Sequence, residues 1–459
     1  MRVTEELCRI ITQTTFATLP VPVVEVAKRI ILDGIAVAVA GAGEEGPRIV
    51  AEHLKSLGAK EVSTVLGQGF KTSPVSAAYV NGIAMHVLDY EPMWSPPTHA
   101  TSPTLPAVLA LAETEKATGS DVIAAFVKGC EVQGRIRLAS QQYEPGHLKY
   151  HPPGVVGVMG SAVAAAHLLT LDQHQLQNAL GIAASRAGGV MANVGTMTKA
   201  THCGWAGSAG LDAALLAKRG FTGNTEIFEA PNGYVDVFFG AAFDYPALLA
   251  FGEPYRLVDP GFAIKLFPSQ YATHFAITAA LDLHQRIGDP TLIRTVRITT
   301  PIMPYVDRPS PRTGLDGKFS FQYTTAAALL DGAVTVRTFS EERRIRPDMV
   351  ALLPRITLVQ SPAIPGEMEK MWVETTVELT DGRYATGRRA TVRCRGPKGF
   401  WGSPLTREEH LVKIRDCLGM RLSKADCERC IQLVDGLDRL DHSGVRELIA
   451  LASATGSGI

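Results

Sequence analysis

The sequence has 459 residues, of which 46% are hydrophobic and 20% are charged, and its 45 basic side chains balance its 45 acidic ones. That length is enough for two or three domains with large cores. Proteins that bind nucleic acids usually carry a basic excess to meet the phosphates. The neutral balance therefore argues against a nucleic-acid partner and favours a small-molecule enzyme.

Neither the amino terminus nor the apolar segments indicate export or membrane insertion. No basic region followed by an apolar run opens the sequence. The longest apolar stretches, residues 30–43 and 154–170, are too short to cross a bilayer comfortably. Seven scattered cysteines do not form the pattern of a disulfide framework. We therefore expect a cytoplasmic protein with free thiols and no membrane partner.

The first 258 residues are predicted to form one helix after another, with a short strand-like run at residues 62–66. Apolar residues from Val23 to Ala38 follow the helical period. Further helices are predicted to begin at Pro74 and Pro103, each after a serine that caps the helix, and at Ser120. The segment 200–218 is rich in alanine and glycine, which permits close packing of helices.

From residue 294 onward the period changes to that of strands. Alternating patterns cover residues 294–300, 355–359, 372–379 and 384–392, and the turn-forming pair Asp381-Gly382 joins the last two. Helical patterns over residues 271–287 and 319–330 lie between them, which makes this part an α+β unit. Three more helices follow, over residues 408–418, 424–436 and 443–451, and these are expected to return to the first domain.

The expected architecture is therefore mainly α with an α+β second domain. A large all-helical domain is built from both chain ends, residues 1–258 and 404–459. Residues 259–403 form the smaller α+β domain. Cys427 and Cys430 have the spacing of a metal or redox pair, but they lie in a predicted helix without a second pair, so ordinary helix residues are favoured.

One glycine motif suggests a nucleotide site, but its context does not support it. Residues 41–46 spell the dinucleotide-binding fingerprint G-x-G-x-x-G. The fingerprint requires a preceding strand, whereas the residues before it follow a helical period. Glu44 and Glu45 would also place two negative charges where a pyrophosphate must lie. We interpret the glycines as a turn between helices.

Two polar clusters lie next to predicted helix starts in the first half of the chain. Asp89 follows one helix, and His99 precedes the next, where unpaired N–H groups attract anions. Capping in a proline-rich loop explains this segment equally well. The second cluster places His151 just before a helix that opens with two prolines and a glycine. By itself, a surface or core histidine explains this position better than a ligand-binding one.

Two further clusters contain a lysine and several histidines. Lys199 lies at the mouth of the alanine-rich helix, with His202 nearby, and an ammonium group in such a position can bind a carboxylate or act as an acid. Schiff-base chemistry has no specific support. The fourth cluster, residues 265–274, contains Gln270 and His274 and lies at the expected domain boundary, where clefts form.

A series of motifs extends these clusters over nearly the whole chain. They occupy residues 32–34, 81–89, 151–152, 181–189, 198–202, 220–223, 267–269 and 319–323. The order and spacing of these motifs resemble those of the MmgE/PrpD family. The resemblance implies a homodimer that uses neither a metal nor an organic cofactor and acts on a small polycarboxylate. Residues 151–157, 305–309 and 329–332 look closest to the branch of cis-aconitate decarboxylases.

The resemblance also supplies the candidate activities. The leading expectation is a cofactor-independent lyase that dehydrates a di- or tricarboxylate, as 2-methylcitrate dehydratase does. The alternatives are decarboxylation of a cis-aconitate-like acid and epimerisation of a dicarboxylate such as iminodisuccinate. A helical dimer that binds small acids without catalysis is a fourth hypothesis, which the site residues disfavour.

The resemblance implies a set of site residues in this sequence. The expected catalytic residues are Asp89, His99, His151 and Lys199, and the expected substrate contacts are Met93, His202, Gln270, His274 and Tyr323. A histidine whose tautomer Asp89 holds is expected to be the base. Met93 and Gln270 depart from the decarboxylase pattern, which has a threonine and a histidine there. Because glutamine cannot exchange a proton near neutral pH, these departures argue against a decarboxylase.

Overall fold

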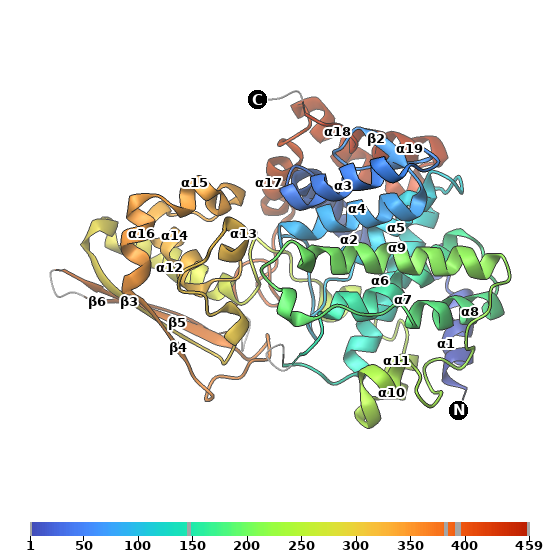
Figure 1. The fold of residues 1–459 in the computed structure, drawn as a ribbon, viewed down its shortest axis with the longest axis horizontal. Helices are drawn as coiled ribbons and strands as arrows, with labels where there is room; N and C mark the ends of the chain where they lie inside the picture. The colour runs from blue at the N-terminus through green and yellow to red at the C-terminus, as the bar shows by residue number, and fades with distance from the viewer. Residues whose placement is uncertain (1, 145–147, 381–383, 391–395, 457–459) are drawn as a thin grey trace.

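The computed structural model describes residues 2–144, 148–380, 384–390 and 396–456. Its helices and its main sheet separate into two parts, with the larger helical domain on the right of Figure 1 and the α+β domain on the left. The fold class expected from the sequence is thus confirmed. Among the described residues, none of the helices combines the length and the apolar character needed to span a bilayer.

The helical domain is built around tightly packed helices of the first half of the chain. These are α1 (Val3–Gln13), α2 (Val21–Gly41), α3 (Glu45–Leu57), α4 (Pro74–Val87), α5 (Thr101–Ala112), α6 (Gly119–Ala139), α7 (Pro152–Leu168), α8 (Gln173–Ala184), α9 (Thr198–Lys218), α10 (Tyr234–Phe238) and α11 (Tyr245–Leu249). A short hairpin of β1 (Ser63–Val65) and β2 (Phe70–Thr72) lies before α4. In the centre, α9 contacts α4, α5 and α7, and α5 contacts α4 and α7.

Glycines allow two of these central helices to touch through their backbones. A methyl group added at Gly82 of α4 would lie 2.7 Å from the Cα atom of Gly204 in α9. Such a separation is closer than side chains allow, so α4 and α9 approach at their glycines. This contact fixes the ends of α4 and α9 relative to each other, and both ends carry polar side chains.

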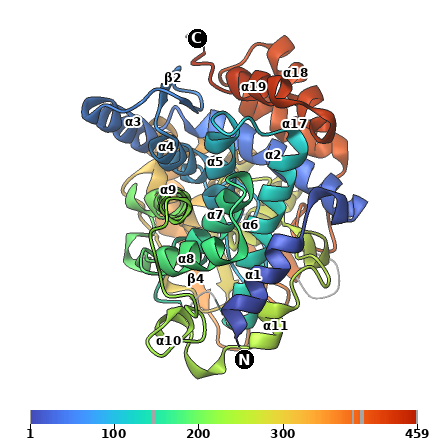
Figure 2. The ribbon, with the colours of Figure 1, turned by 90° about the vertical axis from the view of Figure 1, so that its right-hand side faces the viewer.

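The carboxyl-terminal helices pack on the amino-terminal half, as Figure 2 shows for α17 and α2. They are α17 (Arg407–Leu418), α18 (Lys424–Asp435) and α19 (His442–Leu451). Buried Asp33 of α2 accepts hydrogen bonds from His410 Nε2 at 2.8 Å and from Lys413 Nζ at 3.0 Å, both on α17. Lys413 also donates to the carbonyl oxygen of Tyr90, so this polar network reaches the loop after α4.

The α+β domain contains a four-stranded sheet in the order β4-β3-β5-β6. Its strands are β3 (Ile293–Thr300), β4 (Ile356–Gln360), β5 (Trp372–Leu379) and β6 (Tyr384–Ala390); β3 runs parallel to β4, and the other pairs are antiparallel. Helices α12 (Thr273–Ile287) and α14 (Phe321–Asp331) pack against the sheet. The smaller helices are α13 (Gly314–Gly317), α15 (Glu341–Arg344) and α16 (Pro347–Leu352).

Most predicted elements are present, but one helix start was predicted wrongly. Ser73 caps α4 by accepting a hydrogen bond from the backbone of Ser76, as expected. Helix α5, in contrast, begins at Thr101 rather than Pro103, and Ser102 is not its cap. The Ser102 hydroxyl instead donates to Glu91 Oε1 at 2.7 Å, a contact that local sequence does not reveal.

The two motifs that we set aside as ordinary structure lie in or between helices. Helix α2 continues to Gly41 and α3 begins at Glu45, so the glycine fingerprint follows a helix and not a strand. Cys427 and Cys430 are buried in α18. The predicted turn at Asp381-Gly382 lies outside the described residues. The proposed domain boundaries near residues 258 and 403 stay a prediction.

Candidate active site

Four helix ends of the larger domain meet at one pocket. The pocket encloses about 520 Å³, counted out to its open mouth. The carboxyl end of α4 and the amino ends of α5, α7 and α9 lie around it, and residues 270–271, 305 and 319 of the α+β domain close the other side. Because helix amino ends carry unpaired N–H groups and partial positive charge, this arrangement favours an anionic ligand.

Asp89 lies between two lysines at the base of the pocket. Its Oδ2 atom is 2.6 Å from Lys199 Nζ, and its Oδ1 atom forms a second buried ion pair with Lys265. Lys265 also donates to the Asp89 and Ser269 carbonyl oxygens. Burial alone would raise the pKa of Asp89, but Lys199 and Lys265 outweigh it and hold that pKa well below its usual range.

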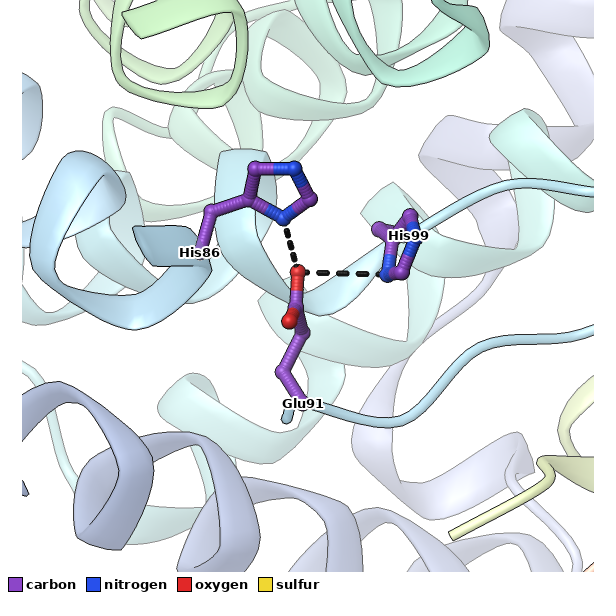
Figure 3. A group of neighbouring side chains, drawn as sticks. All are labelled: His86, Glu91 and His99. Carbon is purple, nitrogen blue, oxygen red and sulfur yellow. Dashed lines mark hydrogen bonds and ion pairs between the residues drawn. The ribbon is translucent and has the colours of Figure 1, made fainter. Parts of the chain in front are cut away.

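Glu91 lies between His86 and His99, as Figure 3 shows. Its Oε1 atom pairs with His86 Nδ1 and lies 3.2 Å from His99 Nδ1. All three groups are buried. Burial would raise the pKa of Glu91, but the two rings hold it well below its usual range, while burial lowers the pKa of His86 to about 4. His86 is therefore neutral at neutral pH and donates its Nδ1 proton to Glu91.

The tautomer of His86 connects the two clusters. With its proton on Nδ1, His86 presents a bare Nε2 atom, which lies 2.9 Å from Lys199 Nζ and accepts from it. A continuous hydrogen-bonded chain thus runs from Glu91 through His86 and Lys199 to Asp89. The carboxylate that fixes a histidine tautomer is Glu91, and not Asp89 as we expected, because Asp89 is fully engaged by lysines.

His151 and His202 form a second pair of rings beside the pocket. His151 precedes α7 and lines the pocket, and its Nδ1 atom lies 3.3 Å from Nδ1 of His202 in α9. Burial, followed by the charge of Lys199, holds the pKa of His151 well below its usual range. The same two causes lower the pKa of His202 to about 4. Both rings are therefore neutral at neutral pH.

The α+β domain supplies a wall of neutral groups. Gln270 donates from Nε2 to the Tyr305 hydroxyl at 3.0 Å and accepts the backbone N–H of Ala272 at 2.7 Å, so its amide is held at both ends. Met93 lines the same wall. On the opposite side, Thr98 has a buried hydroxyl with no hydrogen-bond partner among the described residues, which leaves it available to a ligand.

The structure brings most of the predicted site residues together and leaves two of them, Tyr323 and His274, away from the pocket. Asp89, Met93, His99, His151, Lys199 and Gln270 line the pocket, and His202 contacts His151. Tyr323 does not reach it, because its hydroxyl donates to the Thr338 carbonyl inside the α+β core. Tyr305 is the tyrosine at the pocket. His274 is buried outside the lining, between the rings of Phe267 and Phe400.

The residues that sequence reasoning missed are the partners of the predicted ones. His86 and Glu91 occur in the same polar segment as Asp89, and their alternation with apolar residues near a helix end was a usable signal. Lys265 lies in the fourth cluster, but its pairing with Asp89 joins residues 176 positions apart. No local pattern indicates such a contact, since the packing of the two domains creates it.

His86, Glu91 and His99 also satisfy a simple geometric test for a metal site, because one ligand atom of each lies within 4.8 Å of the others. The hydrogen bonding does not fit a metal ion. A metal on Nδ1 of His86 would leave a proton on Nε2, facing the Lys199 ammonium, which has only donors. The group therefore fits a hydrogen-bonded chain better than a metal centre.

Comparisons with known proteins agree with this two-part organisation. The MmgE/PrpD N-terminal domain matches residues 5–245, and the MmgE/PrpD C-terminal domain matches residues 267–439. Relatives that carry these domains include enzymes named for small carboxylates. The chain belongs to the MmgE/PrpD family.

Named relatives fall into two activities. The chain is 34% identical to the cis-aconitate decarboxylase of Mus musculus over 437 residues, which is 91% of this chain and 87% of that protein. The corresponding human enzyme is 34% identical over 435 residues, 92% of this chain and 89% of that protein. The 2-methylcitrate dehydratase of Cupriavidus necator is 26% identical over 358 residues, 69% of this chain and 70% of that protein.

Proposed function

We propose that the protein is a lyase that removes carbon dioxide from a cis-aconitate-like tricarboxylate without a metal or an organic cofactor. The decarboxylases match more of the chain at higher identity than the dehydratase does. This favours the alternative named above over the dehydration that we expected first. The observation that carries the proposal is the pocket, in which Lys199, His99 and His151 converge beside three helix amino ends.

The first task of such a site is to neutralise a polyanion. The side chain of Lys199 lines the pocket, and the amino ends of α5, α7 and α9 add partial positive charge. The free hydroxyl of Thr98 and the Tyr305 hydroxyl are neutral donors for the remaining oxygens. These groups hold the substrate so that the carboxylate to be lost faces His151.

The second task is to stabilise and then protonate the carbanion. Carbon dioxide leaves as the carbon–carbon bond breaks. The electron pair of that bond delocalises over the alkene toward a neighbouring carboxylate. Lys199 stabilises the negative charge that develops on the oxygens of this carboxylate. The negative charge of the substrate raises the low pKa of His151, so the ring takes up a proton from solvent on binding. That proton then passes to the carbon and closes the reaction.

A substrate panel in deuterated water tests the proposal. Purified protein is incubated with cis-aconitate, 2-methylcitrate and iminodisuccinate, and the products are analysed by NMR and gas release. We expect carbon dioxide from cis-aconitate, with one deuterium placed on carbon in each product molecule. Alkene formation from 2-methylcitrate without gas would identify a dehydratase instead, and deuterium exchange alone would identify an epimerase. Binding without turnover of any substrate would contradict an enzyme.

Dehydration stays the second candidate because of Gln270 and Met93. The Gln270 amide, held by Tyr305 and Ala272, carries no proton that it can exchange. We expect Gln270→His, combined with Met93→Thr, to raise decarboxylation of cis-aconitate by about tenfold or more, since a positioned acid contributes at least that much. Gln270→Asn is the matched control and should give no gain. If the wild-type protein decarboxylates cis-aconitate efficiently and Gln270→His is slower than the wild type, the role given to Gln270 is wrong.

We also propose that the protein works as a homodimer in the cytoplasm, as the family resemblance implies. Met197 and Trp205, two turns apart at the start of α9, are exposed apolar side chains that a second copy can cover. Sedimentation of the wild type and of Trp205→Arg tests this. A monomeric wild type would contradict the dimer.

A further inference from the structure

A second pocket lies at the opposite end of α7 from the candidate active site. It is lined by residues of α1, α6, α7 and α8 and encloses about 600 Å³, counted out to its mouth. His151 precedes α7, and His167 lies near its carboxyl end. Sixteen residues of helix separate the two positions by about 24 Å, so one small ligand cannot occupy both pockets.

Lys128 of α6 is a buried cation that lines this second pocket. Its side chain is 3% exposed, and its Nζ atom lies 3.1 Å from His167 Nδ1. Within the described parts of the chain, no acidic side chain is within ion-pair distance of Lys128. Among the other buried lysines, Lys199 and Lys265 share Asp89, and Lys413 pairs with Asp33. Lys318 also forms no ion pair within the described residues, but its Nζ atom lies over the ring of Phe339 and donates to the Leu88 carbonyl oxygen.

His167 adds a second donor. Because its Nδ1 atom accepts from the Lys128 ammonium, the proton of the neutral ring is on Nε2. Burial lowers the pKa of His167 to about 4 and that of Lys128 to about 8, so near pH 7 the ring is neutral and the lysine is charged. The nearest acid that acts on this ring, Asp121, is engaged by Thr118 at the start of α6.

The remaining lining is largely apolar. It comes from Ile11 of α1, from Val163 and Ala166 of α7, and from Leu171 and Leu176 at α8. His167 is the one residue of α7 that is not buried. Thr12 and Thr170 also line the cavity, and their hydroxyls donate to the backbone carbonyl oxygens of Cys8 and Leu169. A cation and an N–H donor at one point of a largely apolar cavity match a carboxylate that is attached to a short hydrocarbon chain.

We propose that this pocket binds a small monocarboxylate, with its carboxylate on Lys128 and His167 and its apolar tail among Ile11, Val163 and Leu176. The ligand offsets the cost of burying an uncompensated ammonium group. This site is independent of the proposed lyase activity, because none of its residues lines the first pocket.

Titration calorimetry with butyrate tests the proposal. The protein used is the Lys199→Met variant, so that butyrate on Lys199 does not contribute to the signal. We expect saturable binding of one butyrate per chain. Adding Lys128→Met should weaken it by about tenfold or more, the usual effect of losing a charged hydrogen-bond donor. Lys218→Met, an exposed lysine at the end of α9, is the matched control and should change nothing.

The controls separate a ligand site from a structural lysine. Lys128→Met in the otherwise wild-type protein should fold with an unchanged or higher melting temperature and keep full turnover, since the desolvation cost of a buried charge outweighs the hydrogen bond to His167 that is lost. If that variant does not fold, Lys128→Gln serves in its place. Binding of 1-butanol as tightly as butyrate would overturn the proposal, as would butyrate binding that is insensitive to Lys128 or absent in the millimolar range.

Discussion

Lys199 is paired with Asp89, which changes how this lysine is understood. The sequence suggests an ammonium group at the mouth of an apolar helix that only a substrate carboxylate would compensate. In the structure Asp89 and His86 already accept from its Nζ atom. Asp89 also forms an ion pair with Lys265, which does not depend on Lys199. Removing Lys199 therefore leaves no unpaired carboxylate, and its substitution isolates its role toward the substrate.

We expect Lys199→Met to fold normally and to lose turnover by about 100-fold or more, the scale of losing one preorganised stabilising group. Lys199→Arg should not restore full activity, because a planar guanidinium cannot replace a compact ammonium between Asp89 and His86. Initial rates and thermal melts of both variants, with Lys218→Met as control, check this. A lowered melting temperature with normal activity per folded molecule would show a purely structural lysine.

Glu91 is expected to act as a positioning residue. It accepts the Nδ1 proton of His86 and lies beside His99, so it fixes the tautomer through which His86 accepts from Lys199. Glu91→Gln removes the negative charge and presents an amide N–H group to His86 Nδ1. A donor at that position favours the tautomer of His86 with its proton on Nε2. We expect turnover to fall by about tenfold or more, as when a histidine loses its orienting carboxylate.

The pH profile distinguishes positioning by Glu91 from a structural effect. In Glu91→Gln the pH dependence of kcat should change, because the hydrogen-bonded chain to Lys199 is altered, whereas a merely structural role would lower activity equally at every pH. Glu91→Asp should restore part of the activity. Ser102→Ala removes one hydrogen bond to the same oxygen without changing its charge, so it should have a smaller effect. An unchanged profile in Glu91→Gln would contradict the assignment.

At the scale of the elements, the α4–α9 contact positions the site. Helix α4 carries His86 at its end, and α9 carries Lys199 at its start. A methyl group at Gly204 of α9 would meet the backbone oxygen of Tyr79 in α4. We expect Gly204→Ala to lower the free energy of unfolding by about 1–3 kcal/mol, as overpacking does.

Gly204→Ala should also reduce the turnover of the molecules that remain folded, because moving α9 changes the Lys199–His86 distance. Gly188→Ala is the matched control, since a methyl group there meets no atom within 4 Å. Urea unfolding and turnover of both variants check the prediction. A fully active Gly204→Ala protein would show that the close approach does not position the site.

Sequence patterns predicted the elements better than their contacts. Strand β5 was predicted at its observed residues, because its side chains alternate between buried and half-buried positions. The start of α5 was missed because Ser102 bonds to Glu91 instead of capping the helix. Tyr323 was predicted at the site and Tyr305 was not, since the domain packing decides which tyrosine reaches the pocket. Local periodicity contains no information about such long-range choices.

At the scale of the whole molecule, buried histidines link stability to pH. Burial lowers the pKa of His86 to about 4 and that of His274 to about 3. In the unfolded chain a histidine has a pKa near 6.5. Below that value the unfolded state binds protons that the folded state cannot, so acid favours unfolding, and above it these groups have no effect. We expect each of them to lower the free energy of unfolding by up to about 1.4 kcal/mol per pH unit between pH 6 and 5, where the unfolded side chain is largely protonated and the folded one is not.

His274→Phe offers a direct test of this linkage, because His274 packs between Phe267 and Phe400 and a phenyl ring preserves the aromatic contacts. Since Phe does not titrate, the variant should be as stable as the wild type or more stable at pH 5, and its stability should fall less steeply with acid, by up to about 1.4 kcal/mol per pH unit. Urea unfolding at pH 7, 6 and 5 measures both slopes. His53→Gln, at an exposed position, is the control and should keep the wild-type slope. Equal slopes for the wild type and His274→Phe would show that His274 is not kept neutral by the fold.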